Sequence, residues 1–312
     1  MRARFSLSLS LSLALLLLAA TPARAGNAWS AVATPLSGPP EPIGSFSGGC
    51  LVGANPLPLV GDGYQVMRVS RNRYYGHPTL IRFVERLARH AGSQGGRLLV
   101  GDLAQPRGGP MPGGHVSHQS GLDADIWFLQ PARNRLMSGQ DIEKFGAPSM
   151  VRFTEGTLEY ANWSPRYRDT LRQAALSPEV DRIFVNAVIK KALCDSETDR
   201  SWLRKVRPWW GHDAHFHVRL ACPPGSSQCQ PQKPIPPGDG CDPDLANWVR
   251  DIVQAALAPK KPSVKKPRPP AAENLPAACY AVLNNQPNWR QEAVSVKSNP
   301  ASDLYPSSEP PN

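Results

Sequence analysis

Hydrophobic and polar positions alternate in two widely separated segments of the chain. Between Leu122 and Phe128, apolar side chains fill every second position, and Asp123 and Asp125 stand between them. Residues 215–220 show the same alternation, with histidine or arginine between apolar positions. Side chains on a strand point to opposite faces with a period of two, so each segment predicts a strand with one apolar and one polar face. The polar faces carry carboxylates in the first strand and imidazoles in the second.

Helical periodicity and further short apolar runs predict the other elements. Pro78 suits a first helical position and Gly92 an end, and Ser164 suits an N-cap. Residues 26–60 and 130–162 lack a period and predict an extended arm and an irregular region. The predicted helices are 78–92, 164–176, 187–193 and 242–258, and the predicted strands are 64–69, 97–102 and 182–186.

The N-terminus has the pattern of a secretory signal peptide. Arg2 and Arg4 precede an apolar run from Leu7 to Ala20, and a small-x-small site ends at Ala25. Residues 1–25 therefore predict a signal that is cleaved after Ala25 and export of the mature chain. The run is short for a membrane span, so we expect none after cleavage, with an uncleaved anchor as the alternative.

Composition divides the remaining chain. Residues 26–258 form the predicted catalytic domain, 259–273 a Pro/Lys-rich linker, 274–294 a segment tied back by a disulfide, and 295–312 a disordered tail. The formal charge of +10 falls to +7 without the three arginines of the signal. The basic run in the linker has no interleaved aromatic residues, which argues against nucleic-acid binding.

All six cysteines lie after the signal segment, and an even number in an exported chain predicts disulfides. Six cysteines allow fifteen connectivities. Cys222 and Cys229 are close enough in sequence to pair across a turn, and the other pairings stay open. No Cys-x-x-Cys spacing is present, so zinc-knuckle and redox motifs are excluded.

Five of the seven histidines fall in the two alternating segments and their approaches. His118, Asp125 and His217 would supply two nitrogens and one oxygen, the donor set of a catalytic zinc site. His215 shares a strand face with His217 and could act as a base beside the metal. His212 and His115 remain as nearby groups, and Asp123 could orient a histidine or bind a substrate amine. Neither a His-Glu-x-x-His helix nor a Gly-x-Ser-x-Gly elbow is present.

These motifs resemble a known group of peptidases. Ser117-His118-x-x-Gly121-x-x-x-Asp125, followed by His215-x-His217, is similar to the zinc peptidases that include lysostaphin-type enzymes, D-Ala-D-Ala metallopeptidases and the hedgehog domain. Residues 114–125, 202–209 and 211–220 more closely resemble the penicillin-insensitive murein endopeptidases.

The resemblance implies an α+β fold with a central antiparallel sheet and flanking helices, and the alternating strands agree with it. It implies a periplasmic zinc hydrolase, insensitive to penicillin, that cleaves the D-alanyl–meso-diaminopimelyl cross-link of peptidoglycan. His118, Asp125 and His217 would bind Zn²⁺, His215 would be catalytic, and His212 would lie beside the site. His115 would be the candidate ligand of a second ion.

The resemblance also implies three disulfides, and there are two departures from the group. The implied pairs are Cys50–Cys279, Cys194–Cys241 and Cys222–Cys229. The wider group has a small residue where this chain has Asp123, and the tail beyond residue 259 is peculiar to this chain. The alternatives to an endopeptidase are a D,D- or L,D-carboxypeptidase on stem peptides and a non-catalytic peptidoglycan-binding protein. The sequence does not fix the oligomeric state.

Overall fold

The structure is a computed structural model that describes residues 27–113, 116–259, 275–286 and 289–290. The predicted signal peptide, the linker from residue 260 and the predicted tail therefore lie outside the described residues. Among the described helices, none combines the length and apolar character that crossing a membrane requires.

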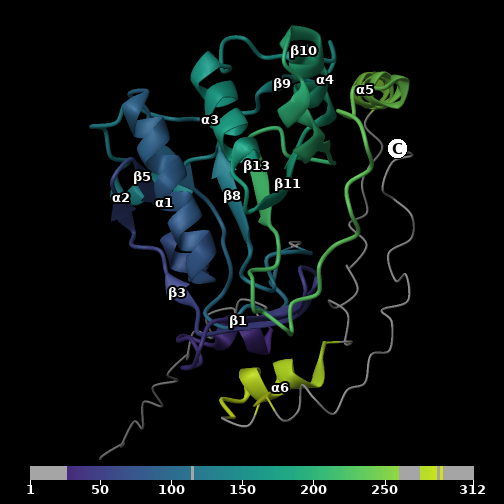
Figure 1. The fold of residues 1–312 in the computed structure, drawn as a ribbon. Helices are drawn as coiled ribbons and strands as arrows, with labels where there is room; N and C mark the ends of the chain where they lie inside the picture. Colours follow the sequence, from purple (N-terminus) through teal and green to yellow (C-terminus); the bar gives the residue numbers. More distant parts are fainter. Residues whose placement is uncertain (1–26, 114–115, 260–274, 287–288, 291–312) are drawn as a thin grey trace, which may run out of the picture.

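The strands and helices follow one another along the chain in the order of their labels in Figure 1. The strands are β1 Glu41–Ser45, β2 Gly48–Val52, β3 Asn55–Pro56, β4 Val60–Gly61, β5 Tyr64–Val66, β6 Tyr75–Gly76, β7 Leu98–Val100, β8 Asp123–Trp127, β9 Val151–Arg152, β10 Thr157–Leu158, β11 Val180–Val185, β12 Val206–Pro208 and β13 His215–Leu220. The helices are α1 Pro78–Ser93, α2 Gly139–Lys144, α3 Pro165–Leu176, α4 Ala187–Ser196, α5 Pro243–Leu257 and α6 Ala277–Leu283, with short 3₁₀ turns at Ala28–Ala31, Val69–Arg71 and Ser201–Lys205.

A seven-stranded sheet with the order β12-β11-β13-β8-β7-β5-β4 forms the centre of the molecule. Its middle pairings, β11–β13, β13–β8 and β8–β7, are antiparallel. The outer pairs β11–β12 and β5–β7 are parallel. The edge pair β4–β5 is again antiparallel. The predicted α+β class is confirmed, and most pairings of the central sheet are antiparallel.

The two alternating segments are adjacent strands in this sheet. β8 and β13 pair so that His217 lies opposite Asp125 and Arg219 opposite Asp123. Their apolar side chains belong to the main core, and Figure 1 shows α1 and α3 side by side over the sheet. The polar side chains point to the opposite face. The helices therefore cover the apolar face that the alternation predicted and leave the histidine-bearing face for a site.

The predicted helices are confirmed, and so is the predicted cap at Ser164. Ser164 and Asp242 accept backbone hydrogen bonds at the starts of α3 and α5, and Asn186 does so at the start of α4. The predicted end of the first helix was one residue early. Gly92 lies inside α1, and the left-handed residue after it is Gly95, with φ 78°.

The extended arm predicted for residues 26–60 is wrong. This stretch contains the antiparallel β1–β2 hairpin. Cys50 and Val52 of the hairpin pack with Cys279 and Val282 of α6 in a second, smaller core. Figure 1 shows β1 and α6 together at one end of the molecule, away from α5. The region 130–162 is likewise more regular than predicted, because it contains α2 and the β9–β10 pair.

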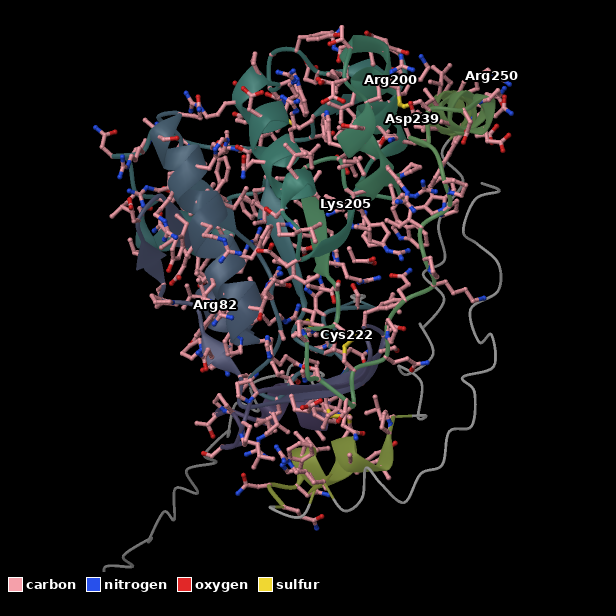
Figure 2. The ribbon with its side chains drawn as sticks, in the orientation of Figure 1. Arg82, Arg200, Lys205, Cys222, Asp239 and Arg250 are labelled. Carbon is pink, nitrogen blue, oxygen red and sulfur yellow. A yellow bond between two sulfur atoms is a disulfide. The ribbon has the colours of Figure 1, made fainter. Side chains whose placement is uncertain are left out.

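The six cysteines form the three disulfides that the resemblance implied. They join Cys50 to Cys279, Cys194 to Cys241 and Cys222 to Cys229. The first ties α6 to the β1–β2 hairpin and the second ties α4 to the start of α5. The third closes a short turn after β13, and Figure 2 marks Cys222 near the hairpin end of the molecule.

Candidate metal centre

Three candidate ligands meet on the polar face of the sheet. His118, Asp125 and His217 offer donor atoms that all lie within 4.8 Å of one another. Asp125 Oδ1 lies 3.4 Å from His118 Nε2 and 3.1 Å from His217 Nδ1. All three residues are buried, at 1 %, 5 % and 4 % exposure respectively. Segments far apart in the sequence therefore bring two imidazoles and a carboxylate to one point.

This donor set fits zinc. Zinc takes imidazole nitrogen and carboxylate oxygen at about 2.0–2.2 Å, so neighbouring ligands of a tetrahedral ion stand about 3.3 Å apart. The two distances from Asp125 Oδ1 are close to that value. Three protein ligands also leave a fourth position for water or substrate, which is the composition of a catalytic rather than a structural zinc site.

Asp125 and His217 are positioned by the sheet itself. They are cross-strand neighbours on β8 and β13, where register alone sets their separation. On the other side of β8, Gly101 N donates to Asp125 O and Asp125 N donates to Asp102 O. Two residues thus oppose one, the arrangement of a β-bulge, and such bulges are over-represented beside active sites. A Cβ on Gly101 would lie 3.2 Å from Asp125 O and 3.3 Å from its Cβ, so a larger residue here would crowd Asp125.

His118 is positioned by a loop rather than a strand. Its backbone is left-handed, with φ 68°, a conformation that is uncommon for a residue with a side chain. The neighbouring Gln119 holds this conformation from both sides. Its backbone N donates to Phe46 O, its backbone O accepts from Gly109 N, and its side chain accepts from Gly49 N. The β1–β2 hairpin therefore supports the loop that presents His118.

The electrostatics of the cluster are strongly coupled. Burial alone would raise the pKa of Asp125, but the positive charges of His118 and His215 and two histidine hydrogen bonds hold it well below its usual value. Burial alone would lower the pKa of His217, but its hydrogen bonds with Asp123 and Asp125 raise it. The carboxylates and His217 therefore stabilise each other's charged forms, and a cation would compete with protons for the histidine nitrogens.

Two more histidines lie at the accessible side of the cluster. His215 Nε2 is 3.6 Å from Asp125 Oδ1, and the side chain of His215 is 30 % exposed. The ring of His212 lies 5.0 Å from that of His215. Its Nδ1 is 2.8 Å from Trp210 O, so Nδ1 carries the proton and Nε2 is left as an acceptor. Burial, followed by the charges of His215 and His217, lowers the pKa of His212 to about 3.

The His212 loop is held by a residue that the sequence interpretation did not single out. Asn186, the N-cap of α4, donates from its backbone N to His212 O and from its side chain to Gly211 O. His212 itself is left-handed, with φ 51°. The sequence placed Asn186 at the end of a predicted strand and did not predict these contacts, because nothing in the local sequence relates α4 to the loop before β13.

A pair of arginines borders the cluster beyond the bulge. The Asp102 carboxylate accepts from Nη1 of Arg71 at 3.0 Å and from Nη1 of Arg73 at 2.8 Å. Asp102 is buried, and its backbone oxygen accepts from Asp125. This ion-pair group braces the strand that carries Asp125.

The tryptophans that precede β13 differ in their burial. Trp202 is buried in the main core. Trp210 is 59 % exposed and packs edge-on against Trp248 of α5, with ring centroids 5.1 Å apart. Trp210 therefore remains a candidate wall for a substrate. His115 lies outside the described residues, and its role stays a prediction.

The mixed sheet and the donor set on it are those expected of a metal-dependent hydrolase. Comparison with known sequences then identifies the family. The chain belongs to the penicillin-insensitive murein endopeptidases, whose sequence model matches residues 42–284. It is therefore a peptidase, and its family acts on murein outside the cytoplasm.

Individual relatives agree over most of the chain. A penicillin-insensitive murein endopeptidase of Klebsiella pneumoniae (strain 342) is 46 % identical over 269 residues, covering 86 % of this chain and 92 % of the relative. A protein of the same name from Yersinia enterocolitica is 44 % identical over 272 residues, covering 86 % and 94 %. One from Escherichia coli O1:K1 is 44 % identical over 269 residues, covering 86 % and 92 %.

Proposed function

We propose that this chain is a zinc-dependent endopeptidase of the periplasm that hydrolyses the D-alanyl–meso-diaminopimelyl cross-link of peptidoglycan. The observation that carries the proposal is the His118, Asp125 and His217 donor set, with His215 at its accessible side. The predicted signal segment 1–25 supports the periplasmic location. The three disulfides also support an oxidising compartment.

Each residue of the centre has a proposed task. His118, Asp125 and His217 hold the metal. Zinc held by these residues would act as a Lewis acid on a peptide carbonyl and would lower the pKa of water to about 7. His215 Nε2, beside Asp125 Oδ1, accepts a proton and returns it to the leaving amine. His212, neutral at physiological pH, accepts a hydrogen bond at Nε2 and so orients groups next to His215.

This chemistry explains insensitivity to penicillin. A β-lactam inactivates an enzyme by acylating a serine nucleophile. The proposed centre uses nitrogen and oxygen ligands and a water, so it provides no serine for the drug to acylate.

Cross-linked muropeptide dimers provide the first test. The purified mature protein is incubated with dimers, with and without a strong chelator, and the products are followed by mass. We expect dimers to become monomers without loss of terminal alanine, and the chelator to stop the reaction. Loss of terminal alanine alone would identify a carboxypeptidase. Bound zinc without turnover would contradict the enzymatic proposal and favour a peptidoglycan-binding protein.

The role of His215 is tested by His215→Ala, with His90→Ala on α1 as the matched control. We expect His215→Ala to keep its zinc and to lose about 10²–10⁴-fold in kcat, the usual contribution of a positioned general base. Zinc content and dimer turnover are measured on the same preparations. Normal turnover by His215→Ala would remove His215 from the mechanism.

A further inference from the structure

Asp123 is the most deeply buried carboxylate beside the candidate metal centre. It lies in β8, two residues before Asp125, and none of its surface is exposed. A buried carboxylate is costly unless it is paired and hydrogen-bonded. The mechanism above gives Asp123 no task, so its burial calls for another explanation.

The partners of Asp123 point to that explanation. Its Oδ1 accepts from His217 Nε2 at 2.6 Å and from Arg219 Nε at 2.7 Å. The other ring nitrogen of His217, Nδ1, lies 3.1 Å from Asp125 Oδ1. The Nε2 side of the imidazole ring therefore contacts Asp123, and the Nδ1 side faces the candidate metal site.

We propose that Asp123 is a positioning residue that fixes His217 as an Nδ1 ligand. The inference rests on the metal site of the proposed function. A neutral imidazole carries one proton, and the hydrogen bond at one nitrogen decides which nitrogen is free to bind metal. With Nε2–H donated to Asp123, the Nδ1 lone pair is directed towards Asp125 and the metal. The charged acceptor also makes the imidazole a stronger donor to the ion.

Arg219 and Phe46 hold Asp123 in place. Arg219 is opposite Asp123 in the β8–β13 register, and its Nη1 donates to Gln232 Oε1 at 2.6 Å. Its guanidinium carbon lies 3.6 Å from the ring centroid of Phe46, in cation–π contact. The carboxylate is thus clamped between a histidine and an arginine that is itself fixed on its far side.

Phe46 connects this clamp to the other histidine of the centre. It lies in the turn between β1 and β2, and its carbonyl accepts from the backbone N of Gln119, next to His118. One turn therefore supports His118 through its backbone and His217 through Arg219 and Asp123. Both imidazoles depend on the same hairpin for their orientation.

The competing explanation is that Asp123 only neutralises the buried Arg219. The two explanations differ in one measurable quantity, the affinity for metal. An ion pair that serves folding alone changes stability and leaves the zinc dissociation constant unaltered. A positioning carboxylate changes that constant even when the fold is intact.

The test measures zinc binding by competition with a chromophoric chelator, using zinc chloride and the full mature chain. Asp123→Asn keeps the shape and one acceptor but loses the charge, and we expect about tenfold weaker binding. The double variant Asp123→Ala/Arg219→Met leaves no buried charge alone, and we expect about a hundredfold loss. These values span the effect of outer partners at known metal sites. Circular dichroism confirms folding, and long-range proton–nitrogen NMR reports the His217 tautomer.

Arg182→Gln is the matched control. Arg182 is a buried arginine opposite Arg219 in the β11–β13 register, and its partners are Asp181 and a backbone carbonyl. We expect Arg182→Gln to lower stability and to leave zinc affinity within about twofold. Wild-type zinc affinity and an unchanged His217 tautomer in folded Asp123 variants would overturn the proposal. A wild-type chain that binds no zinc would instead refute the proposed function itself.

Discussion

The candidate ligands come from two regions that are built in different ways. Asp125 and His217 lie on paired strands in the main core, where register fixes them. His118 lies on a loop with a left-handed backbone, supported by the β1–β2 hairpin and α6. The strand side is made rigid by its own hydrogen-bond ladder. The loop side needs a second core, which is closed by the disulfide between Cys50 and Cys279.

Because the two regions are supported differently, substitutions in them should affect metal binding differently. A change in the main core should affect overall stability before it affects metal binding. A change in the second core should weaken metal binding as well as stability, because it releases one ligand while the other two stay in place. Four changes test this contrast.

The largest effect is expected from the disulfides. Removing Cys50–Cys279 with a double Cys→Ala variant should cost about 5 kcal/mol, and removing Cys194–Cys241 about 4 kcal/mol, by loop-closure entropy. Only the first should also weaken zinc binding, because only the first holds the hairpin beneath His118. Urea denaturation and chelator competition on both variants measure the two quantities. Equal zinc affinities would show that the loop needs no support from α6.

A buried lysine tests the stability of the strand side alone. Lys190 of α4 is fully buried, and its Nζ donates to Leu203 O and Asp239 O. Figure 2 places Asp239 near α5, at the end away from the hairpin. Burial, modified by nearby charges, lowers the pKa of Lys190 from its usual value to about 7.

The sign of the pH effect follows from that shift. Between pH 7 and 10.5 the unfolded chain binds a proton at Lys190 that the folded chain does not, so stability rises with pH. From pH 7 to 10 the free energy of unfolding of the wild type should rise by about 3 kcal/mol relative to that of Lys190→Met. This value takes about 1.4 kcal/mol for each pKa unit and is reduced because the folded protein can relax around the charge. Urea midpoints at several pH values give the difference. Parallel curves for the two proteins would show that Lys190 keeps its ordinary pKa.

A glycine on the loop side tests the left-handed turn after His118. Gly121 has φ 74°, and a Cβ there would lie 2.3 Å from Leu51 of β2. Gly121→Ala should therefore cost about 1–3 kcal/mol in strain and displace His118. Gly113→Ala is the matched control, since it has φ 89° but open space around it. Zinc affinity should fall for the first variant and hold for the second.

The smallest effect is expected at His77, the N-cap of α1. Its Nδ1 accepts from Thr79 N, and its backbone N donates to Gly121 O. Burial, then Arg82, lowers the pKa of His77 to about 4. As the pH falls from 6.5 to 4, His77 is protonated in the unfolded chain but not yet in the folded chain. The free energy of unfolding therefore decreases over this pH range. His77→Asn, which keeps a cap, should retain about 1–2 kcal/mol more at pH 4.5 than the wild type. Equal acid denaturation midpoints would contradict this.

The sequence predicted the strand side better than the loop side for a physical reason. Alternation along Leu122–Phe128 and His215–Leu220 reflects burial of one face, and it placed Asp125 and His217 correctly on the other. The loop side rests on Pro-, Gly- and Ser-rich sequence, where alternation is weak. Gly44, Gly48 and Gly49 interrupt the apolar positions of the hairpin, and the predicted arm was wrong for that reason.

The supporting contacts were beyond the reach of local patterns. Asp123 and Arg219 could be assigned to polar faces, but their pairing depends on a register that periodicity leaves open. Phe46, Gln119 and Asn186 act through contacts between distant segments, and no short-range signal marks them. The resemblance to a known family supplied the disulfide pairs, which the cysteine count alone left among fifteen possibilities.

Arg107 makes the loop of His118 depend on α6, the last described helix of the chain. It follows β7 in the loop towards His118, and its guanidinium donates to Val282 O, Leu283 O and Asn285 Oδ1 at the end of α6. Chains emerge from the ribosome N-terminus first. Every strand of the sheet is therefore synthesised before the segment that braces the loop. A truncated chain that ends before α6 would keep both strand-borne ligands but lose the Arg107 contacts that support the loop of His118.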